Sequence, residues 1–539
     1  MRARDEMILA DLIQIRAEQT PDQDVLTFEH LSLDGGATPD EVRTFAALAT
    51  NANRIAAGLV VKGVARGDRF AIMMRNHPEF VEAMIAASIT GALFVPIDPR
   101  TRGEKLVFML RNAGCAGIVC ADYCLPEIEA VRRQLLDLRW ILVVETGEAT
   151  APLSSVTDVE ALAEILARPA ATVDVRAKSV EAPLQIMFTS GTTGDPKGIV
   201  GTNFRFCAAG MLGALFGYQR DECPYTGLSL THGNAQSVTL APVLSMGLRA
   251  VFSRRFTKSR LWDVCRRYGC TTFSLMGGMA TGIYSEPARP DDARNPVRLV
   301  VSGGMPAAIW EAFERRFDVR ILEFYGAMDG GGMAYKAAGE GPIGSFGKPM
   351  FGIEMKILDP DGSECPPGVV GEICTRPADR TEVAIEYFRD PEASAKKIRG
   401  GWNRSGDMGH ADADGWLFFD YRAGGGIRHN GDFVNAGFVE KAIAEYAGIA
   451  DVFVYGVPAG SGAPGEKDVV AAIVPASGGG LDVQSVFAAC RAKLEANFVP
   501  TYLQVVDEIP KTASEKPQER LLLAQFGPAA PNVHRERRG

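Results

Sequence analysis

The stretch RFAIMMRNHPEFVEAMIAASITGALFVPI, residues 69–97, decides the fold class. Residues 69–74 and 92–97 are short apolar runs typical of buried strands, and residues 78–89 have helical spacing. A helix between two buried strands predicts a parallel sheet covered by helices. The longest apolar run, 83–97, is interrupted by Ser88, Thr90 and Gly91 and is shorter than the ~20 residues of a membrane-spanning helix.

The same alternation continues along the chain. We expect strands over 184–188, 248–252 and 299–301, and helices beginning near Asn203 and over 259–268, which together make two α/β layers. From Gly344 onward, turn signals such as DPDG at 359–362 predict a β-rich subdomain. Helix and strand patterns return after three glycines at 424–426. The expected fold is α/β, with a large N-terminal domain at 1–422 and a small, mobile α/β C-terminal domain at 423–539.

The composition is that of a globular protein and argues against several classes of function. The 539 residues include 57 Lys and Arg against 66 Asp and Glu, so no overall basic field favours nucleic acid or an anionic membrane. The ten cysteines lack the paired spacing of a zinc or redox site, and reduced, buried thiols suit the cytoplasm. No signal peptide is evident at the N-terminus, and we expect a cytoplasmic protein.

The sharpest chemical signal is TSGTTGDPKG at 189–198. Its glycines allow close backbone approach, its hydroxyls donate hydrogen bonds, and Lys197 adds a positive charge, a combination suited to a polyphosphate. It is not a Walker loop, because no Gly-Lys-Ser/Thr follows at the required spacing. We expect it between the strand at 184–188 and a following helix. A polar surface turn is the alternative reading of its composition.

The order of these ten residues resembles the phosphate loop of the acyl-adenylate-forming superfamily, which includes acyl-CoA synthetases, luciferases and adenylation domains of peptide synthetases. SGGMP at 302–306, EFYGAMD at 323–329 and RSGD at 404–407 extend the resemblance over nearly the whole chain. The resemblance implies that Tyr325 stacks on adenine, and that Asp407 and Arg422 reach the ribose. The other implied nucleotide residues are Thr189, Ser190, Gly191, Thr192, Thr193, Gly194, Lys197, Gly303, Gly304, Met305 and Gly326, with Thr189 and Asp329 at Mg²⁺.

The resemblance also implies a catalytic lysine near the C-terminus, in PKTASEK at 510–516. Lys516 would bridge the carboxylate and the α-phosphate, where a mobile ammonium suits the charge that develops between two anions. Lys511 is the rival, and a solvated lysine is the ordinary reading of either residue. After adenylation the C-terminal domain would turn and present a face around Gly431 to coenzyme A.

The candidate acid site is centred on THGNAQ at 231–236. The resemblance implies that His232 gates or touches the carboxylate, although a lone histidine is more often a core residue or a helix cap. This segment looks closest to the carnitine and crotonobetaine CoA ligase branch. The expected acid-binding residues are His232, Asn234, Gln236, Gly277, Gly278, Gly304, Gly330 and Gly331, which suggest a roomy site for a medium-sized, cyclic or aromatic acid.

Several positions depart from the family pattern. Asp329 replaces the usual Glu, and Met328 replaces a Thr that donates a hydrogen bond to phosphate. Two glycines, at 424 and 425, stand where Lys-Asp is usual, and Glu515 replaces the glycine before the catalytic lysine. Such changes indicate either a specialised substrate or a degenerate enzyme. We favour specialisation, because Lys197, Asp407, Arg422 and Lys516 are all present.

The expected function is ligation of a carboxylic acid to coenzyme A through an acyl-adenylate, with ATP, Mg²⁺ and coenzyme A as cofactors or co-substrates. Two alternatives stay open: a nucleotide-binding protein without turnover, and a luciferase-like oxygenase that acts on an adenylate. An amino-acid-activating domain is disfavoured, because no aspartate near His232 would meet an α-ammonium group. The expected partners are small molecules, with a homodimer as a further expectation and neither nucleic acid nor membrane.

Overall fold

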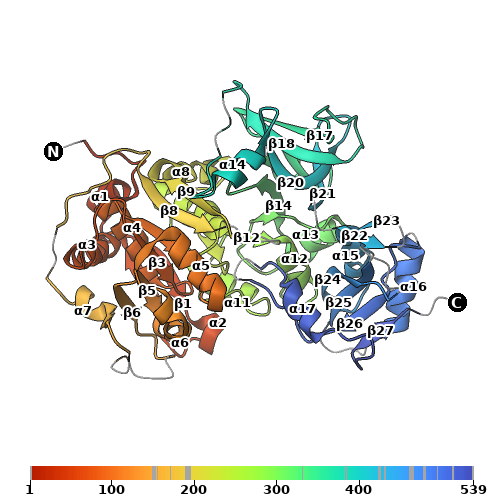
Figure 1. The fold of residues 1–539 in the computed structure, drawn as a ribbon, viewed down its shortest axis with the longest axis horizontal. Helices are drawn as coiled ribbons and strands as arrows, with labels where there is room; N and C mark the ends of the chain where they lie inside the picture. Colours follow the sequence, from red (N-terminus) through yellow and green to blue (C-terminus); the bar gives the residue numbers. More distant parts are fainter. Residues whose placement is uncertain are drawn as a thin grey trace. The chain divides into compact units, whose positions relative to one another are not determined.

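The computed structural model describes residues 3–148, 153, 156–169, 172–188, 196–329, 332–381, 383, 385–422, 426–429, 432–460, 467–476, 481–494, 496–512 and 515–536. The chain forms two compact units (Figure 1). The first contains residues 1–274 and 386–396, and the second contains residues 275–385 and 397–539.

The first unit contains a mostly parallel seven-stranded sheet. Its central strands β3, β4 and β5 are apolar runs whose residues are buried almost throughout, as expected for strands covered on both faces. Only β9 runs antiparallel to its neighbour. In spatial order the strands are β7 (Val159–Ala161), β6 (Trp140–Val144), β5 (Cys115–Ala121), β3 (Arg69–Met73), β4 (Leu93–Pro96), β8 (Pro183–Phe188) and β9 (Gly198–Thr202).

Two long helices of this unit begin and end at clear local signals. In α3 (Phe45–Val61), the Thr44 side chain accepts a hydrogen bond from the Ala47 N–H and caps the N-terminus. Pro78 begins α4 (Pro78–Thr90), and Gly91 ends it at a φ of 67°. The remaining helices are α1 (Leu9–Gln19), α2 (Leu31–Asp34), α5 (Gly103–Ala113), α6 (Leu125–Val131), α7 (Leu162–Leu166), α8 (Asn203–Ala208), α9 (Met211–Leu215), α10 (Ala241–Met246) and α11 (Leu261–Tyr268).

A second group of strands has the order β12 (Thr272–Met276), β10 (Pro224–Thr226), β11 (Ala250–Ser253), β1 (Asp24–Glu29) and β2 (Glu41–Thr44). These strands belong to the first unit, except for residues 275–276 of β12. All pairs are parallel except β1 with β2. The expected two α/β layers are therefore confirmed. A π-helix over Ala235–Leu240 leads directly into α10, and the sequence pattern did not predict it.

The second unit begins with α12 (Gly277–Tyr284), parallel β13 (Leu299–Gly303) and β14 (Arg320–Gly326), and α13 (Trp310–Phe317). An antiparallel series follows and confirms the predicted β-rich subdomain. In spatial order it contains β15 (Met333–Lys336), β16 (Ser345–Pro349), β21 (Leu417–Arg422), β20 (Trp402–Ala411), β18 (Gly371–Pro377) and β17 (Ile353–Leu358), with β19 (Ile398–Arg399) paired to β20. Helix α14 (Pro391–Lys397) ends where the chain re-enters this unit.

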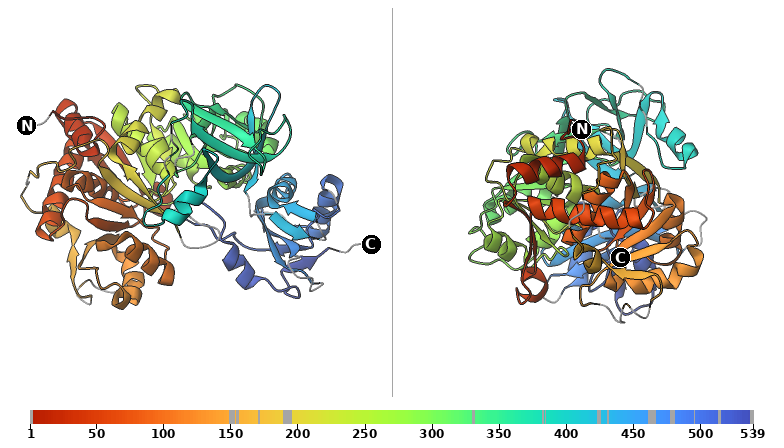
Figure 2. Two further views of the ribbon diagram at one scale, coloured as in Figure 1. Left: turned by 45° about the horizontal axis from the view of Figure 1, so that its top comes forward. Right: turned by 90° about the vertical axis from the view of Figure 1, so that its left-hand side faces the viewer.

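The C-terminal part holds a four-stranded sheet, β24 (Ile449–Pro458), β25 (Lys467–Pro475), β26 (Tyr502–Val505) and β27 (Val533–Arg535). One apolar core includes Val439 of α15 (Ala436–Ala444) and Phe487 of α16 (Val483–Lys493). A separate core includes Leu522 of α17 (Glu519–Gln525), so helices contribute to both faces of the sheet (Figure 2). A small hairpin of β22 (Gly426–His429) and β23 (Asp432–Asn435) precedes them.

The helix expected near Asn203 is confirmed as α8, but a strand that the sequence did not predict lies between it and the phosphate motif. The chain after the motif forms β9, antiparallel to β8, and only then begins α8, whose N-terminus Thr202 caps. The motif therefore joins two strands, and Ile199 of the second one is buried. Residues 189–195 of the motif themselves lie outside the described residues.

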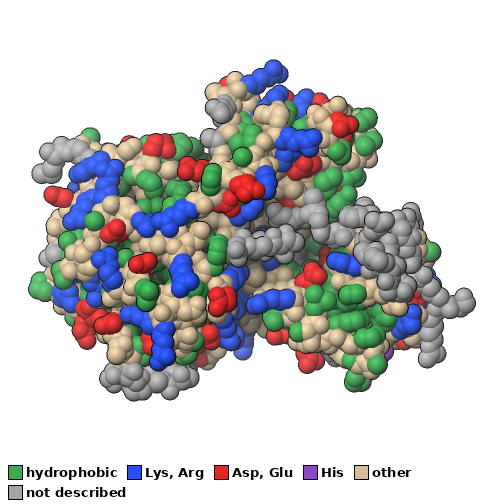
Figure 3. All heavy atoms as spheres, in the orientation of Figure 1, with side chains coloured by type: hydrophobic (Ala, Val, Ile, Leu, Met, Phe, Trp, Pro, Cys, Tyr) green, Lys and Arg blue, Asp and Glu red, His purple; other side chains and the backbone are tan. Residues whose placement is uncertain are grey.

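The surface agrees with the charge balance of the sequence. On the face that Figure 3 shows, lysine and arginine side chains are interspersed with aspartate and glutamate. Within the part of the chain that the structure describes, no helix is both long enough and apolar enough to cross a membrane. All ten cysteines are free thiols, and nine of them are buried.

Candidate active site

The aromatic residue that the resemblance assigns to adenine contacts the carboxylate that it assigns to ribose. Tyr325, near the end of β14, donates a hydrogen bond of 2.7 Å from its hydroxyl to Oδ2 of Asp407 on β20. The Tyr325 ring stacks on Phe346, with ring centroids 4.7 Å apart. An aromatic face beside a carboxylate suits a nucleoside, because the carboxylate oxygens accept hydrogen bonds from both ribose hydroxyls.

Strand register brings the second ribose candidate to the same place. Asp407 and Arg422 are paired residues of the antiparallel strands β20 and β21. Nothing is described of the Arg422 side chain. The Ser405 hydroxyl accepts a hydrogen bond of 2.9 Å from the Asp407 N–H and donates one of 2.6 Å to the Ile373 carbonyl. These contacts hold the backbone at Asp407.

A buried carboxylate that sequence reasoning missed organises the turn after β13. Glu323 is 4% exposed and accepts hydrogen bonds from the N–H groups of Gly304 and Met305. Burial raises the pKa of Glu323 to about 7, against the opposing effect of these hydrogen bonds. Glu323 and Tyr325 are two residues apart on one strand, so their side chains share a face of the sheet. This spacing is the sequence signal that would have identified Glu323 as a site residue.

The two glycines of this turn have different constraints. Gly304 has a φ of 107°, which an L-residue rarely adopts. A Cβ on Gly303 would meet no heavy atom of its surroundings closer than 3.9 Å. Packing within the described part of the protein therefore does not require glycine at 303, whereas backbone conformation requires it at 304.

The carboxylate assigned to Mg²⁺ is held by a lysine that the sequence did not single out. Nζ of Lys397 lies 2.7 Å from Oδ2 of Asp329, and the side chains are 15% and 12% exposed. Among the described residues no cluster of three or more His, Cys, Asp or Glu side chains could hold a metal ion. The ammonium on Oδ2 leaves only the buried Oδ1 to a metal ion, and a divalent cation there would lie close to a like charge. Asp329 as arranged here is therefore a poor metal ligand.

Lys197 and the strand β9 that follows it contact a distant segment of the first unit. Its ammonium lies 5.2 Å from the centroid of the Tyr387 ring, within cation–π range. The Phe388 N–H donates a hydrogen bond of 2.7 Å to the Gly198 carbonyl. Sequence reasoning gave no signal for these two contacts. The first places the Tyr387 ring beside Lys197, the predicted phosphate-binding lysine.

His232 has a defined hydrogen-bonding role in the first unit. Its Nδ1 accepts a hydrogen bond of 3.2 Å from the Asn234 N–H, so the neutral ring carries its proton on Nε2. Oδ1 of Asn234 and Oε1 of Gln236 are buried and make no hydrogen bond with a described residue. Buried acceptors of this kind are costly unless a donor reaches them.

Asn76, a residue that sequence reasoning missed, holds the segment that leads to His232. It is fully buried, and its amide donates hydrogen bonds of 2.9 Å to the Leu228 carbonyl and 2.8 Å to the Ser253 carbonyl. Its side-chain oxygen accepts a hydrogen bond of 2.8 Å from the Leu230 N–H. One side chain thus joins the end of β11 to the 228–230 segment.

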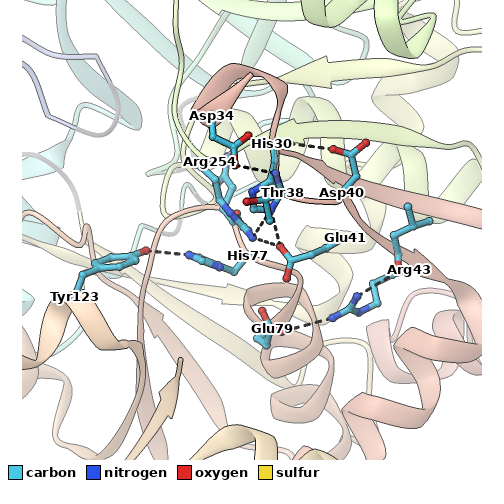
Figure 4. A network of polar contacts seen from close by, with 12 residues as sticks. His30, Asp34, Thr38, Asp40, Glu41, Arg43, His77, Glu79, Tyr123 and Arg254 are labelled. Carbon is cyan, nitrogen blue, oxygen red and sulfur yellow. Dashed lines mark hydrogen bonds and ion pairs between the residues drawn. The ribbon is translucent and has the colours of Figure 1, made fainter. Parts of the chain in front are cut away.

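A polar network connects to Asn76 through Arg254, and Figure 4 shows its side chains Arg254, Glu41, His30 and His77. Arg254, 7% exposed, donates hydrogen bonds to the Asn76 carbonyl and to Glu41. Burial and the nearby Arg254 lower the pKa of His30, whose Nε2 lies 3.3 Å from the Arg254 guanidinium. Burial lowers the pKa of His77 to about 3, and this ring contacts the Tyr123 hydroxyl at 3.1 Å. Both histidines are therefore neutral near pH 7.

The C-terminal lysine loop lies in the second unit. The Thr512 N–H donates a hydrogen bond of 2.8 Å to the Lys516 carbonyl, and the Lys516 N–H donates one of 3.2 Å to the Thr512 hydroxyl. The rival Lys511 forms an ion pair with Asp451. Glu515 has a φ of 59°, so it adopts the left-handed conformation that glycine favours, at the position where the superfamily has glycine.

The remaining candidates are placed as follows. Gly277 and Gly278 begin α12, and Gly326 ends β14. Gly330, Gly331, Gly431 and the motif residues Thr189, Ser190, Gly191, Thr192, Thr193 and Gly194 lie outside the described residues. The second unit brings together Gly303–Met305, Tyr325 and Asp407, with Arg422 in register. Lys197, His232, Asn234 and Gln236 belong to the first unit.

Comparison with known proteins shows the family of the chain. Residues 13–387 match the model of the AMP-binding enzyme family, and residues 439–516 match the AMP-binding enzyme C-terminal domain. The first match alone spans more than half of the 539 residues, so the chain belongs to the AMP-binding enzyme family.

Relatives of similar length include CoA ligases. Crotonobetaine/carnitine–CoA ligase from Salmonella typhi is 28% identical over 480 residues, covering 88% of this chain and 91% of the relative. A medium/long-chain-fatty-acid–CoA ligase from Mycobacterium marinum is 29% identical over 465 residues, covering 85% of this chain and 86% of the relative.

Solved structures show the same fold. An anthranilate CoA ligase in complex with anthranoyl-AMP superposes with a TM-score of 0.82 at 22% identity, covering 96% of each chain. An o-succinylbenzoate CoA synthetase from Bacillus subtilis with its acyl-adenylate has a TM-score of 0.74 at 23% identity, covering 95% of this chain and 97% of that one.

Proposed function

We propose that this AMP-binding enzyme is a carboxylate–CoA ligase that works through an acyl-adenylate. The observation that carries the proposal is the group formed by Tyr325, Asp407 and the turn at 303–305. It offers an aromatic face, a carboxylate for a vicinal diol and a turn where a Cβ on Gly303 would meet no atom of the described residues closer than 3.9 Å. The relatives that are named as CoA ligases support the same activity.

In the first half-reaction a carboxylate oxygen of the acid attacks the α-phosphorus of ATP. The bond from that phosphorus to pyrophosphate breaks, which leaves an acyl-adenylate. Mg²⁺ enters with ATP as part of the substrate and neutralises phosphate charge. Tyr325, Asp407 and Arg422 hold the nucleoside, the 189–194 loop and Lys197 hold the β- and γ-phosphates, and Lys516 neutralises the approaching carboxylate and phosphate.

In the second half-reaction the thiol sulfur of coenzyme A attacks the acyl carbon, the thiol proton is lost, and AMP leaves. The C-terminal domain, residues 423–539, turns between the two steps, removes Lys516 and presents the Gly431 face to coenzyme A. The ion pair of Lys511 with Asp451 supports Lys516 as the catalytic lysine, because it gives Lys511 a structural partner.

The acid is medium-sized and cyclic or aromatic, and it carries a hydrogen-bond donor. The absence of side chains at Gly277, Gly278, Gly330 and Gly331 in the sequence supports a roomy site, and His232 donates through Nε2 to the carboxylate. The buried acceptors of Asn234 and Gln236 favour a hydroxyl or amino group on the acid. Nine buried free thiols support a cytoplasmic enzyme, and a homodimer is a further prediction that light scattering tests.

The test is acid-dependent exchange of pyrophosphate into ATP, followed by thioester formation when coenzyme A is added. Paired acids with and without an amino or hydroxyl group, such as aminobenzoate and benzoate, form the panel. Lys516→Ala abolishes exchange, and Lys511→Ala retains it. ATP binding without exchange for any acid would instead indicate a binding protein, and acid-dependent oxygen uptake would indicate an oxygenase.

A further inference from the structure

Lys397 makes two contacts in the candidate nucleotide site. Its ammonium pairs with Asp329 at 2.7 Å and donates a hydrogen bond of 3.2 Å to the Ser405 carbonyl. Asp329 closes the motif at 323–329, and Ser405 belongs to the motif at 404–407. All three residues lie in the second unit. One side chain therefore joins the two motifs at a point other than the Tyr325–Asp407 hydrogen bond.

The Lys397 contact changes the charge that a nucleotide meets. A lone carboxylate at 329 would repel phosphate unless a metal ion lay between them. With an ammonium at hydrogen-bond distance the pair is neutral overall, and its low exposure limits screening by solvent. A divalent cation on the same carboxylate would lie close to the ammonium, and like charges at such a separation repel strongly.

The local sequence agrees with this arrangement. Asp329 is one methylene shorter than glutamate, and Met328 has no hydroxyl to offer a phosphate. The shorter carboxylate weakens metal binding after β14, and the missing hydroxyl removes a hydrogen bond to phosphate. A lysine ammonium offers three hydrogen-bond donors on a flexible stem, so it can keep Asp329 and still donate to a phosphate oxygen.

We propose that Lys397 is a positioning residue of the nucleotide site and the counter-ion of Asp329, in the place that a protein-bound metal ion would take. Mg²⁺ then reaches the site on the phosphates of ATP, without Asp329 as a ligand. This inference rests on the proposed function only for the identity of the nucleotide.

The experiment measures binding of a non-hydrolysable ATP analogue by calorimetry, first in EDTA and then over a titration of Mg²⁺. Lys397→Met leaves Asp329 without its counter-ion, and metal-free binding weakens about tenfold. Asp329→Asn in the Lys397→Met background restores binding to within about twofold of the wild type. Asp329→Asn alone changes the half-saturating Mg²⁺ concentration less than about twofold.

Two variants control for charge and folding. Lys396→Met removes the neighbouring lysine, which is 73% exposed and pairs with Glu392, and leaves analogue binding unchanged. Lys397→Arg keeps the cation and binds the analogue within about threefold of the wild type. Melting temperatures of all variants identify any that fail to fold. If Lys397→Met does not fold, Lys397→Arg replaces it in the comparison with Asp329→Asn.

Two results would overturn the proposal. One is a rise of about tenfold or more in the half-saturating Mg²⁺ for Asp329→Asn with Lys397 in place, which indicates direct metal ligation. The other is an effect of Lys397→Met no larger than that of Lys396→Met. If the wild type binds ATP but forms no thioester, the proposed function is wrong, and the binding experiments still test the role of Lys397. If the wild type binds no ATP, the proposed function and the role of Lys397 are both wrong.

Discussion

The hydroxyl of Tyr325 donates a hydrogen bond of 2.7 Å to Oδ2 of Asp407, across 82 residues of sequence. This bond joins two motifs that are separate in the chain and fixes the aromatic ring relative to the carboxylate. Stacking of the Tyr325 ring on Phe346 restricts the tilt of the ring. The ring and the carboxylate are thus placed before any nucleotide arrives, which lowers the entropy cost of binding.

Replacing Tyr325 by Phe tests this placement. The change removes one hydroxyl and keeps the ring on Phe346, so we expect a stability loss of about 1 kcal/mol. Asp407 loses a donor that orients it, and KM for ATP rises several-fold while KM for coenzyme A stays constant. Steady-state kinetics with each substrate varied checks this split. An equal rise in both KM values would contradict it.

The two glycines of the 303–305 turn should respond differently to alanine. Gly303→Ala adds a methyl that meets no atom of its described surroundings closer than 3.9 Å, so the variant folds normally but binds ATP more weakly. Gly304→Ala forces an L-residue to a φ of 107° and costs about 1–2 kcal/mol of stability. Melting curves and ATP titrations measure both. Unchanged ATP affinity in Gly303→Ala would show that the nucleotide does not approach this turn.

Glu323 makes stability depend on pH. Its pKa in the folded chain is about 7, raised by burial from an ordinary value of 4.5. Because the folded state holds this proton more tightly, the contribution of Glu323 to the free energy of unfolding is complete below pH 4.5 and is lost as pH rises to about 7.

Glu440 has the same sign of shift, and His77 has the opposite one, so the wild-type profile is a sum of several groups. The difference between the wild type and Glu323→Gln isolates one of them. We expect Glu323→Gln to lose less stability between pH 5 and pH 7 than the wild type does, in denaturant titrations at fixed temperature. Parallel profiles would contradict the raised pKa of Glu323.

Asn76 should affect the acid site more than the nucleotide site. Asn76→Ala leaves two backbone carbonyls and one N–H without their side-chain partner, which costs about 2–4 kcal/mol. The segment leading to His232 loosens, so KM for the acid rises while KM for ATP is unchanged. Asn203→Ala is the matched control, because Asn203 is equally buried and bonds to Leu9 and Ala182 instead. An equal rise in KM for the acid in both variants would show that Asn76 has only a structural role.

The amino-acid sequence by itself determined the α/β class and the positions of most elements. The predicted strand 69–74 is β3 (Arg69–Met73), and the predicted helix 78–89 is α4 (Pro78–Thr90). These patterns are local, because burial of one face or of a whole strand imposes a short period on apolar residues. The order of residues in the motifs also sufficed to indicate the family, which the family models confirm.

Local patterns failed where a long-range contact decided the structure. Gly198 and Gly201 hid the period of β9, which pairs with β8 and borders Phe388. Glu323, Asn76 and Lys397 looked like ordinary polar residues, and only folding brought each to its partners. A hydrogen bond or ion pair between distant segments leaves no period in the sequence, because it depends on strand register and burial. The tertiary structure alone therefore decided which charges and donors meet at the site.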